Sequence, residues 1–243
     1  MHRFFAGRDA FADGKVYIDG GDVVHITKVL RLKAGDSVVV CDGASNDYLC
    51  AVETIDKNLV TLSIIEQIPN DTESKTSITL YQGIPKSDKM DFIIQKCVEL
   101  GVKKIVPVET ARIVAKVKDG DKKQIRWQRI AAEAAKQCGR GVIPEIGDVL
   151  TFAQAVAVEH ELKLMPYECE KDGLLSSALK SVTTGADIGI YIGPEGGFDK
   201  AEADMAVDAG VKTVTLGKRI LRCETAGLAT VAAVMYALDE WNI

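Results

Sequence analysis

Two segments near the end of the sequence combine glycines with charged residues, a combination that could bind a small ligand and act on it. They read GPEGGF at 193–198 and LGKRILRCETAG at 216–227. Glycine lets the backbone approach a ligand closely because it has no Cβ. Glu195 and Glu224 could each remove a proton from a substrate, or could equally orient their own loop. Arg222 could stabilise developing negative charge, because an arginine stays protonated at neutral pH.

The type of ligand can be narrowed by the patterns that these segments do not match. The first segment lacks the Lys-Ser/Thr pair of a P-loop, and its spacing is not GxGxxG. Glu195 would also repel a phosphate group. A neutral or cationic ligand held by backbone groups fits better, and S-adenosyl-L-methionine meets that description with its sulfonium and its adenine. On the pattern alone, two ordinary strand-to-helix turns remain an equal alternative.

The elements around these segments predict an α/β arrangement that would place both at one edge of a sheet. An apolar run at 188–192 predicts a strand that stops at the Gly-Pro turn. Asp199 begins an Asp variant of the capping box, so a helix should follow and end near Gly210. A second strand at 211–216 and a helix from about Thr225 complete the order. Ligands of open α/β sheets bind at the carboxyl ends of strands, where both segments lie.

The pair of motifs resembles the SPOUT class of methyltransferases and, more narrowly, the RsmE family, which methylates N3 of a uridine in small-subunit (16S) ribosomal RNA. The similarity extends to HRFF at 2–5 and HITKVLRLKAGD at 25–36, so it covers the whole chain. The resemblance implies a small N-terminal PUA-like β-barrel followed by a SPOUT-type α/β domain with a C-terminal trefoil knot, a rare exception to unknotted topology. It also implies S-adenosyl-L-methionine as cofactor, bound in the knot, and a homodimer.

The order of predicted elements divides the chain into two domains. Short β-rich segments with turns about every ten residues predict a small barrel, and we place this RNA-binding domain at 1–70. PNDTESKT at 69–76 has the composition of a linker. Strand–helix–strand order then implies parallel pairing, and we place the SPOUT methyltransferase domain with its cofactor-binding knot at 75–243. Its further expected elements are strands at 78–84, 104–110 and 162–168, and helices from about 86 to Gly101 and at 121–139, 152–159 and 173–180.

Charge is distributed unevenly along the chain. The net charge of −5 argues against a general polyanion binder. Residues 75–145, however, carry 15 lysines and arginines against 8 acidic residues, which could be the footprint of an RNA partner or simply a solvated helix face. His25 is expected to be a packing or turn residue, and Lys89 shares the expected ligand edge with Lys86. The candidate RNA-binding residues are Arg3, Arg8, Lys28, Arg31, Lys86, Arg112, Gln137 and Arg140.

The resemblance and the glycine pattern together suggest residues for the cofactor and for catalysis. The uracil N3 proton must be removed or the resulting anion stabilised, which makes Arg222 the electrostatic candidate and Glu195 or Glu224 the candidate base. Cys223 is given no role. The exit of the 162–168 strand should form one wall of the cofactor pocket. The cofactor-binding candidates are Met165, Gly193, Glu195, Gly196, Gly197, Leu216, Gly217, Ile220, Leu221 and Arg222.

Composition excludes several other classes of protein. The six cysteines are scattered without a CxxC motif, so reduced thiols are expected rather than disulfides or a metal site. No apolar run reaches the ~20 residues of a membrane span, and the first residues lack the apolar region of a signal peptide. We therefore expect a cytoplasmic protein with no metal and no membrane partner.

The leading interpretation is thus a homodimeric enzyme acting in rRNA processing and ribosome biogenesis, on 16S rRNA or on the assembled small ribosomal subunit. Two alternatives stay open, namely a SPOUT methyltransferase acting on tRNA and a non-catalytic RNA-binding factor in ribosome assembly. The expected dimer surface lies on the last helix, at Leu228, Val231, Met235, Leu238 and Trp241.

Overall fold

The computed structural model describes residues 1–113 and 120–241. Its chain forms two compact units, and each has its own sheet. The first unit includes residues 135–143, which the sequence analysis placed in the second domain, because the end of a long helix and the loop after it pack there. The units are Met1–Glu73 with Ala135–Ile143, and Ser74–Ala134 with Pro144–Ile243.

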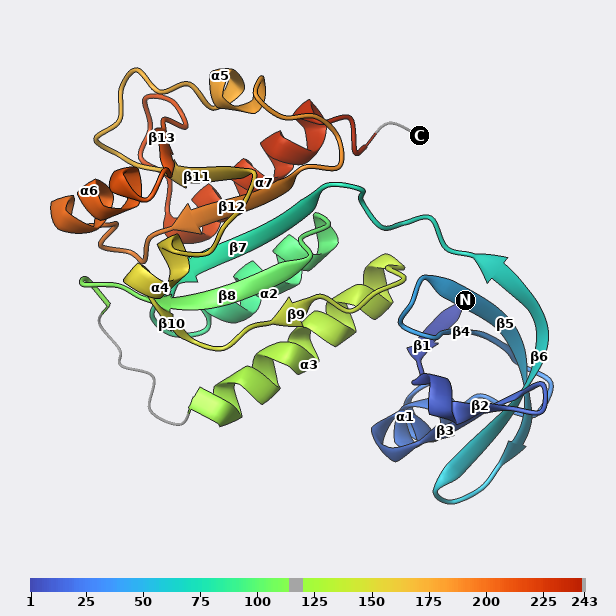
Figure 1. Cartoon of the computed structure of the whole chain (residues 1–243). Coiled ribbons are helices and arrows are strands. Elements are labelled where there is room, and N and C mark those ends of the chain that lie inside the picture. Colours follow the sequence, from blue (N-terminus) through green and yellow to red (C-terminus); the bar gives the residue numbers. More distant parts are fainter. Residues whose placement is uncertain (114–119, 242–243) are drawn as a thin grey trace. The chain divides into compact units, whose positions relative to one another are not determined.

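The first unit is built on a six-stranded sheet in the order β1-β4-β5-β6-β3-β2 (Figure 1). All of its strand pairs are antiparallel except β1 with β4. Alternate apolar residues such as Val38 and Val40 point into one core, as half-buried strands require. His25 packs its ring edge-on against Phe4. The elements are β1 (His2–Phe5), a 3-10 turn (Arg8–Ala10), β2 (Phe11–Ala12), β3 (Lys15–Asp19), α1 (Gly20–Val24), a π-helical turn (His25–Val29), β4 (Ser37–Cys41), β5 (Asn46–Ile55) and β6 (Leu59–Pro69).

The second unit is an α/β fold on a seven-stranded sheet, in the order β10-β8-β7-β12-β11-β13 with β9 paired to β8 (Figure 1). Every strand pair in this sheet is parallel. Its elements are β7 (Ser77–Gly83), α2 (Lys89–Glu99), β8 (Lys104–Glu109), α3 (Gly120–Cys138, of which the last four residues belong to the first unit), β9 (Glu145–Ile146), β10 (Leu150–Thr151), α4 (Phe152–Val156), β11 (Leu162–Pro166), α5 (Leu175–Leu179), β12 (Asp187–Ile192), α6 (Lys200–Asp208), β13 (Lys212–Val214) and α7 (Cys223–Ala237).

The central strands of the second unit are buried on both faces, which explains their nearly continuous apolar sequences. Tyr81 and Tyr191 stack on each other on the face covered by α4 and α6. Ile192 lies on the other face, within van der Waals distance of a Cβ placed on Gly227 of α7. Helices therefore cover both faces of the sheet, and the strand ends are left to form a site.

The order of the strands brings together segments that are far apart in sequence. The strand β12 lies between β7 and β11, and β13 lies on the other side of β11. Because the strands are parallel, the segments that follow β7, β11, β12 and β13 all emerge at the same edge. Both glycine segments of the sequence analysis are among them.

The last helix, α7, differs from its expected role as an exposed dimer surface. Val231, Met235 and Leu238 are buried within the protomer, because α7 packs against α2, β7 and β12. Tyr236 and Trp241 remain exposed near its end. Val231, Met235 and Leu238 are therefore not available as a surface for a second copy.

Three further features concern membrane spans, metal sites and disulfides. None of the helices in the described part of the chain is long and apolar enough to span a bilayer. Across residues 1–113 and 120–241, no group of three or more His, Cys, Asp or Glu residues is arranged to hold a metal ion. The six cysteines form no disulfide with one another.

Candidate active site

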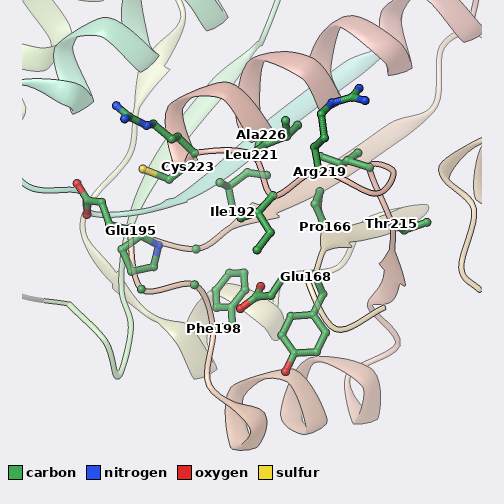
Figure 2. Close-up of a pocket in the computed structure, with 18 of the residues that line it drawn as sticks. Pro166, Glu168, Ile192, Glu195, Phe198, Thr215, Arg219, Leu221, Cys223 and Ala226 are labelled. Carbon is green, nitrogen blue, oxygen red and sulfur yellow. The ribbon is translucent and has the colours of Figure 1, made fainter. Parts of the chain in front are cut away.

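A cavity of about 500 Å³ opens at the carboxyl edge of the second sheet (Figure 2). Its size is that of a small-molecule or cofactor site. The walls come from the ends of β11 and β12, the start of α2, the segment after β13 and the first turn of α7. The lining residues are Lys89, Pro166–Glu168, Ile192–Phe198, Thr215–Cys223 and Ala226.

The wall of the cavity is largely apolar on two sides. Ile192 and Phe198 are nearly fully buried, and Leu221, Pro166 and Ala226 are half-buried. Figure 2 shows these side chains around the opening. Such a wall suits a flat, uncharged ring, and the nearby backbone groups can orient it through hydrogen bonds.

The loop from 193 to 198 requires glycine at two positions. A Cβ on Gly193 would lie 2.9 Å from the backbone carbon of Gly197, so the loop could not close. Gly197 has φ +65°, and a Cβ there would lie 2.7 Å from Glu168 Oε1. Arg112 Nη1 donates a 2.7 Å hydrogen bond to the carbonyl of Gly196, which fixes the outer side of the loop.

The segment after β13 forms the opposite wall and is open to solvent. Gly217 has φ +97°, and a Cβ there would meet no heavy atom within 4 Å. Ile220 is 88% exposed, although it is a large apolar side chain beside the cavity. Arg222 is the N-cap residue of α7 and is exposed. In the described part of the chain, its guanidinium makes no ion pair.

Lys89, the first residue of α2, joins the two carboxylates that the sequence singled out. Its Nζ lies 3.1 Å from Glu195 Oε1 and 3.3 Å from Glu224 Oε2. The backbone N–H of Lys86 also donates to both carboxylate oxygens of Glu195. In the turn between Lys86 and Lys89, Ser87 has φ +55°, a left-handed conformation that is uncommon outside glycine. Strained residues of this kind cluster at functional sites.

These three groups fix one another in their charged forms. Burial alone would raise the pKa of Glu195, but hydrogen bonds from its own N–H, Lys89 and the Lys86 N–H together lower it. The pKa of Glu224 is likewise lowered, against burial, by its own N–H, the Cys223 thiol and Lys89. The hydrogen bond to Glu195 contributes most to raising the pKa of Lys89. All three are therefore ionised at neutral pH.

Cys223 stays a protonated thiol in this setting. Burial, followed by its hydrogen bond to Glu224, raises the pKa of Cys223 to about 12. The Sγ lies 3.2 Å from Glu224 Oε2, to which the thiol donates. A thiol with so high a pKa is a poor nucleophile at neutral pH, which agrees with giving it no role in covalent chemistry.

The loop after β11 is fastened by Glu170. Its carboxylate accepts hydrogen bonds from the N–H groups of Lys171, Asp172 and Gly173 and from the Thr213 hydroxyl. The Thr213 bond and these N–H bonds lower the pKa of Glu170 from 4.5 to about 2. The loop that carries Glu168 is thereby tied to β13.

We expect Glu170→Gln to destabilise the protein in a pH-dependent way. A carboxylate whose pKa is depressed on folding stabilises the fold fully above its unfolded pKa near 4.5 and loses this as pH falls toward 2. The loss at pH 7 should be about 1 kcal/mol, because solvent screens these bonds. Melting temperatures measured from pH 7 to pH 2.5 should converge for variant and wild type below pH 4.5. A constant difference across that range, or no difference in comparison with exposed Glu161→Gln, would contradict this role.

The structure brings most of the predicted cofactor residues together around one cavity. Met165 is the exception, because its side chain is fully buried in the core cluster on the α4 and α6 face. The residues that follow it, Pro166, Tyr167 and Glu168, line the cavity instead. The predicted residues that do line it are Gly193, Glu195, Gly196, Gly197, Leu216, Gly217, Ile220, Leu221 and Arg222.

Two of the predicted RNA-binding residues have their side chains paired with acidic residues inside the first unit. Arg3 makes a two-pronged ion pair with Asp47, at 2.6 and 2.7 Å, and also donates to the carbonyl of Arg140. Arg140 is 5% exposed and pairs with Glu73 at 2.6 Å. The other candidates are exposed: Arg8, Lys28, Arg31, Lys86, Arg112 and Gln137.

Two functional candidates were not predicted from the sequence, namely Lys89 as the partner of both carboxylates and Glu168 in the cavity. Lys89 was placed on the correct sheet edge, but its partners lie 106 and 135 residues away in sequence. Glu168 follows the end of a buried strand. That position is the signal that could have found it.

The comparisons with known proteins now define the class. Residues 72–235 match a family described as an RNA methyltransferase domain, and residues 18–65 match an RNA methyltransferase PUA domain. The fold and cavity are therefore those of an RNA methyltransferase with an N-terminal PUA-like domain.

Curated relatives narrow the class further. The chain is 34% identical to ribosomal RNA small subunit methyltransferase E of Bacillus subtilis, over 91% of this chain and 90% of the relative. It is 36% identical to the protein of the same name from Mesomycoplasma hyopneumoniae, over 94% and 96%. The chain belongs to the ribosomal RNA small subunit methyltransferase E (RsmE) family, which confirms the resemblance inferred from the two motifs.

Solved structures agree with this assignment. A Neisseria gonorrhoeae ribosomal RNA small subunit methyltransferase E bound to S-adenosylmethionine superposes with a TM-score of 0.85 at 31% identity, over 97% of each chain. A Legionella pneumophila protein solved with the same cofactor gives 0.89 at 28% identity, also over 97% of each chain.

Proposed function

We propose that this protein transfers a methyl group from S-adenosylmethionine to N3 of a uridine in 16S ribosomal RNA. The observation that carries the proposal is the cavity between the two glycine segments, at the carboxyl ends of β11, β12 and β13. Membership of the RsmE family and the cofactor-bound relatives supply the substrate class.

The residues around the cavity fit this cofactor. The apolar side chains of Ile192, Phe198 and Leu221 suit an adenine, and the backbone of the 193–197 and 216–222 segments suits its polar edges. Gly217 leaves open space where a Cβ would otherwise stand, so its backbone can approach a ligand closely. When bound, S-adenosylmethionine supplies an electrophilic methyl group. The chain itself must then position the uracil and favour its N3 anion.

Lys89 is our leading candidate for stabilising that anion. Its ammonium lines the cavity, is charged at neutral pH, and is held by Glu195 and Glu224 with one N–H left to donate. The two carboxylates, whose pKa values are lowered, are weak bases and serve to position Lys89. Arg222, exposed at the rim, remains a second cationic candidate that can follow the base as it enters.

Other parts of the chain complete the proposal. The segment from β12 to α7 forms a trefoil knot around the cofactor, and residues 1–70 dock the RNA while 75–243 hold the cofactor. Arg8, Lys28, Arg31, Lys86, Arg112 and Gln137 are the exposed candidates for RNA contact. The enzyme acts as a homodimer in the cytoplasm.

The decisive experiment offers the purified protein three substrates with labelled cofactor: 16S rRNA, assembled small subunits and total tRNA. Mass spectrometry of the digested RNA should find 3-methyluridine in the first or second and none in the third. Methylation of tRNA alone would favour a tRNA enzyme. Tight RNA binding without any transfer would favour an assembly factor.

A further inference from the structure

Glu168 places a carboxylate in the cavity, and the proposed reaction as described so far gives it no role. It follows β11 and lines the cavity, and Figure 2 shows its carboxylate beside Phe198 and facing Ile192. Its two oxygens lie 2.7 and 3.2 Å from the position that a Cβ on Gly197 would take. The carboxylate thus stands directly over the glycine loop.

The charge of Glu168 is not neutralised by a neighbour. The other carboxylate of the cavity wall, Glu195, is paired with Lys89. Among residues 1–113 and 120–241, Glu168 makes no ion pair. The nearby Arg112 donates a hydrogen bond from Nη1 to the carbonyl of Gly196. Glu168 is itself exposed, so water screens part of its charge, but an unpaired carboxylate in the cavity wall attracts a cationic ligand at short range.

The loop that carries Glu168 is held in place by its neighbour. Glu170, two residues along, ties the loop to Thr213 and to three backbone N–H groups. Gly197 leaves room for the Glu168 side chain that any other residue would take away. A tied loop therefore presents an unpaired carboxylate in the wall of the cavity, where it can act on a charged ligand.

We propose that Glu168 makes the cavity prefer the cationic methyl donor over its own by-product. This inference rests on the proposed function. In the transfer, the sulfur–methyl bond breaks with its electron pair staying on sulfur, the methyl carbon bonds to N3, and the N3 proton passes to solvent. The sulfonium of S-adenosylmethionine thereby becomes the neutral thioether of S-adenosylhomocysteine. The attraction of Glu168 for the positive sulfur disappears in the same step, and this favours release of the by-product.

Calorimetry tests this without any turnover. Dissociation constants for S-adenosylmethionine and S-adenosylhomocysteine are measured on wild type, Glu168→Gln and a control, Glu161→Gln. Glu161 is an exposed glutamate that directly precedes the first residue of β11 and lies outside the cavity. The control therefore removes the same charge at a different place. Glutamine keeps the size of the side chain at 168.

The expected result is a selective loss. Glu168→Gln should weaken S-adenosylmethionine binding about fivefold and leave S-adenosylhomocysteine binding nearly unchanged, so the preference falls by that factor. The effect should shrink at high salt, and Glu161→Gln should behave as wild type. Equal weakening of both ligands, or an unchanged preference, would overturn the inference and leave Glu168 a structural residue. Failure of wild type to bind either ligand would instead overturn the proposed function itself.

Discussion

Replacement of Lys89 by methionine is expected to slow methyl transfer about a hundredfold while changing cofactor affinity little. Removing one well-placed donor to a developing oxyanion costs on the order of 3 kcal/mol, and Lys89 is the ammonium that contacts both Glu195 and Glu224. Without it, two ionised carboxylates would remain near the base and would oppose formation of the uracil anion. Methionine preserves most of the length of the stem, so packing should change little.

Single-turnover rates on 16S rRNA or small subunits, with cofactor affinity and melting temperature on the same protein, would measure this effect. A matched control is Lys96→Met, because Lys96 lies on the same helix and pairs with Glu99 outside the cavity. Lys89→Arg should restore part of the rate, since the charge returns. A rate close to wild type in Lys89→Met, or a loss of affinity and stability that accounts for the slower rate, would rule out this role.

The comparison with Arg222 shows where sequence reasoning reaches its limit. Arg222 is the cation nearest in sequence to Glu224. The sequence alone does not show whether its loop also meets the loop that carries Glu195. In the structure, the cation that contacts both carboxylates comes from α2. This contact depends on β12 pairing with β7, a long-range choice that no local pattern encodes. The role of Arg222 itself stays a prediction.

Local features were predicted well because their physics is local. The apolar run at 188–192 and the capping box at Asp199 appear in β12 and α6 as expected, since burial periodicity and cap chemistry act over a few residues. The prediction that each glycine segment follows a strand is confirmed for the same reason. The helix expected at 152–159 ends at Val156.

Side-chain partners were predicted less well because they depend on tertiary packing. Arg3 and Arg140 look like solvated charges in the sequence, but Asp47 and Glu73 neutralise them within the first unit. A buried arginine needs such a partner, and nothing in the sequence indicates which acid will supply it. Met165 was misplaced by a related limit, since alternate residues of a strand face opposite sides and the cavity begins one residue later.

The largest loss of binding is expected from Gly217→Val. Gly217 lines the cavity with φ +97° and has open space where a Cβ would stand. A valine there must either occupy that space, which the proposed cofactor needs, or turn the loop away from its left-handed conformation. Either change should weaken S-adenosylmethionine binding at least a hundredfold, which corresponds to about 2.8 kcal/mol.

A second glycine separates this effect from simple strain. Gly210 follows the end of α6 with φ +79°, lies outside the cavity, and likewise has no heavy atom within 4 Å of the position that a Cβ would take. Valine costs about 1–3 kcal/mol at either position, because a β-branched residue is strained at positive φ. Both variants should therefore melt at similarly lowered temperatures, and only Gly217→Val should lose the cofactor when binding is measured by calorimetry. Equal affinity in the two variants would remove the segment after β13 from the cofactor site, because strain alone would then explain everything that the substitution does.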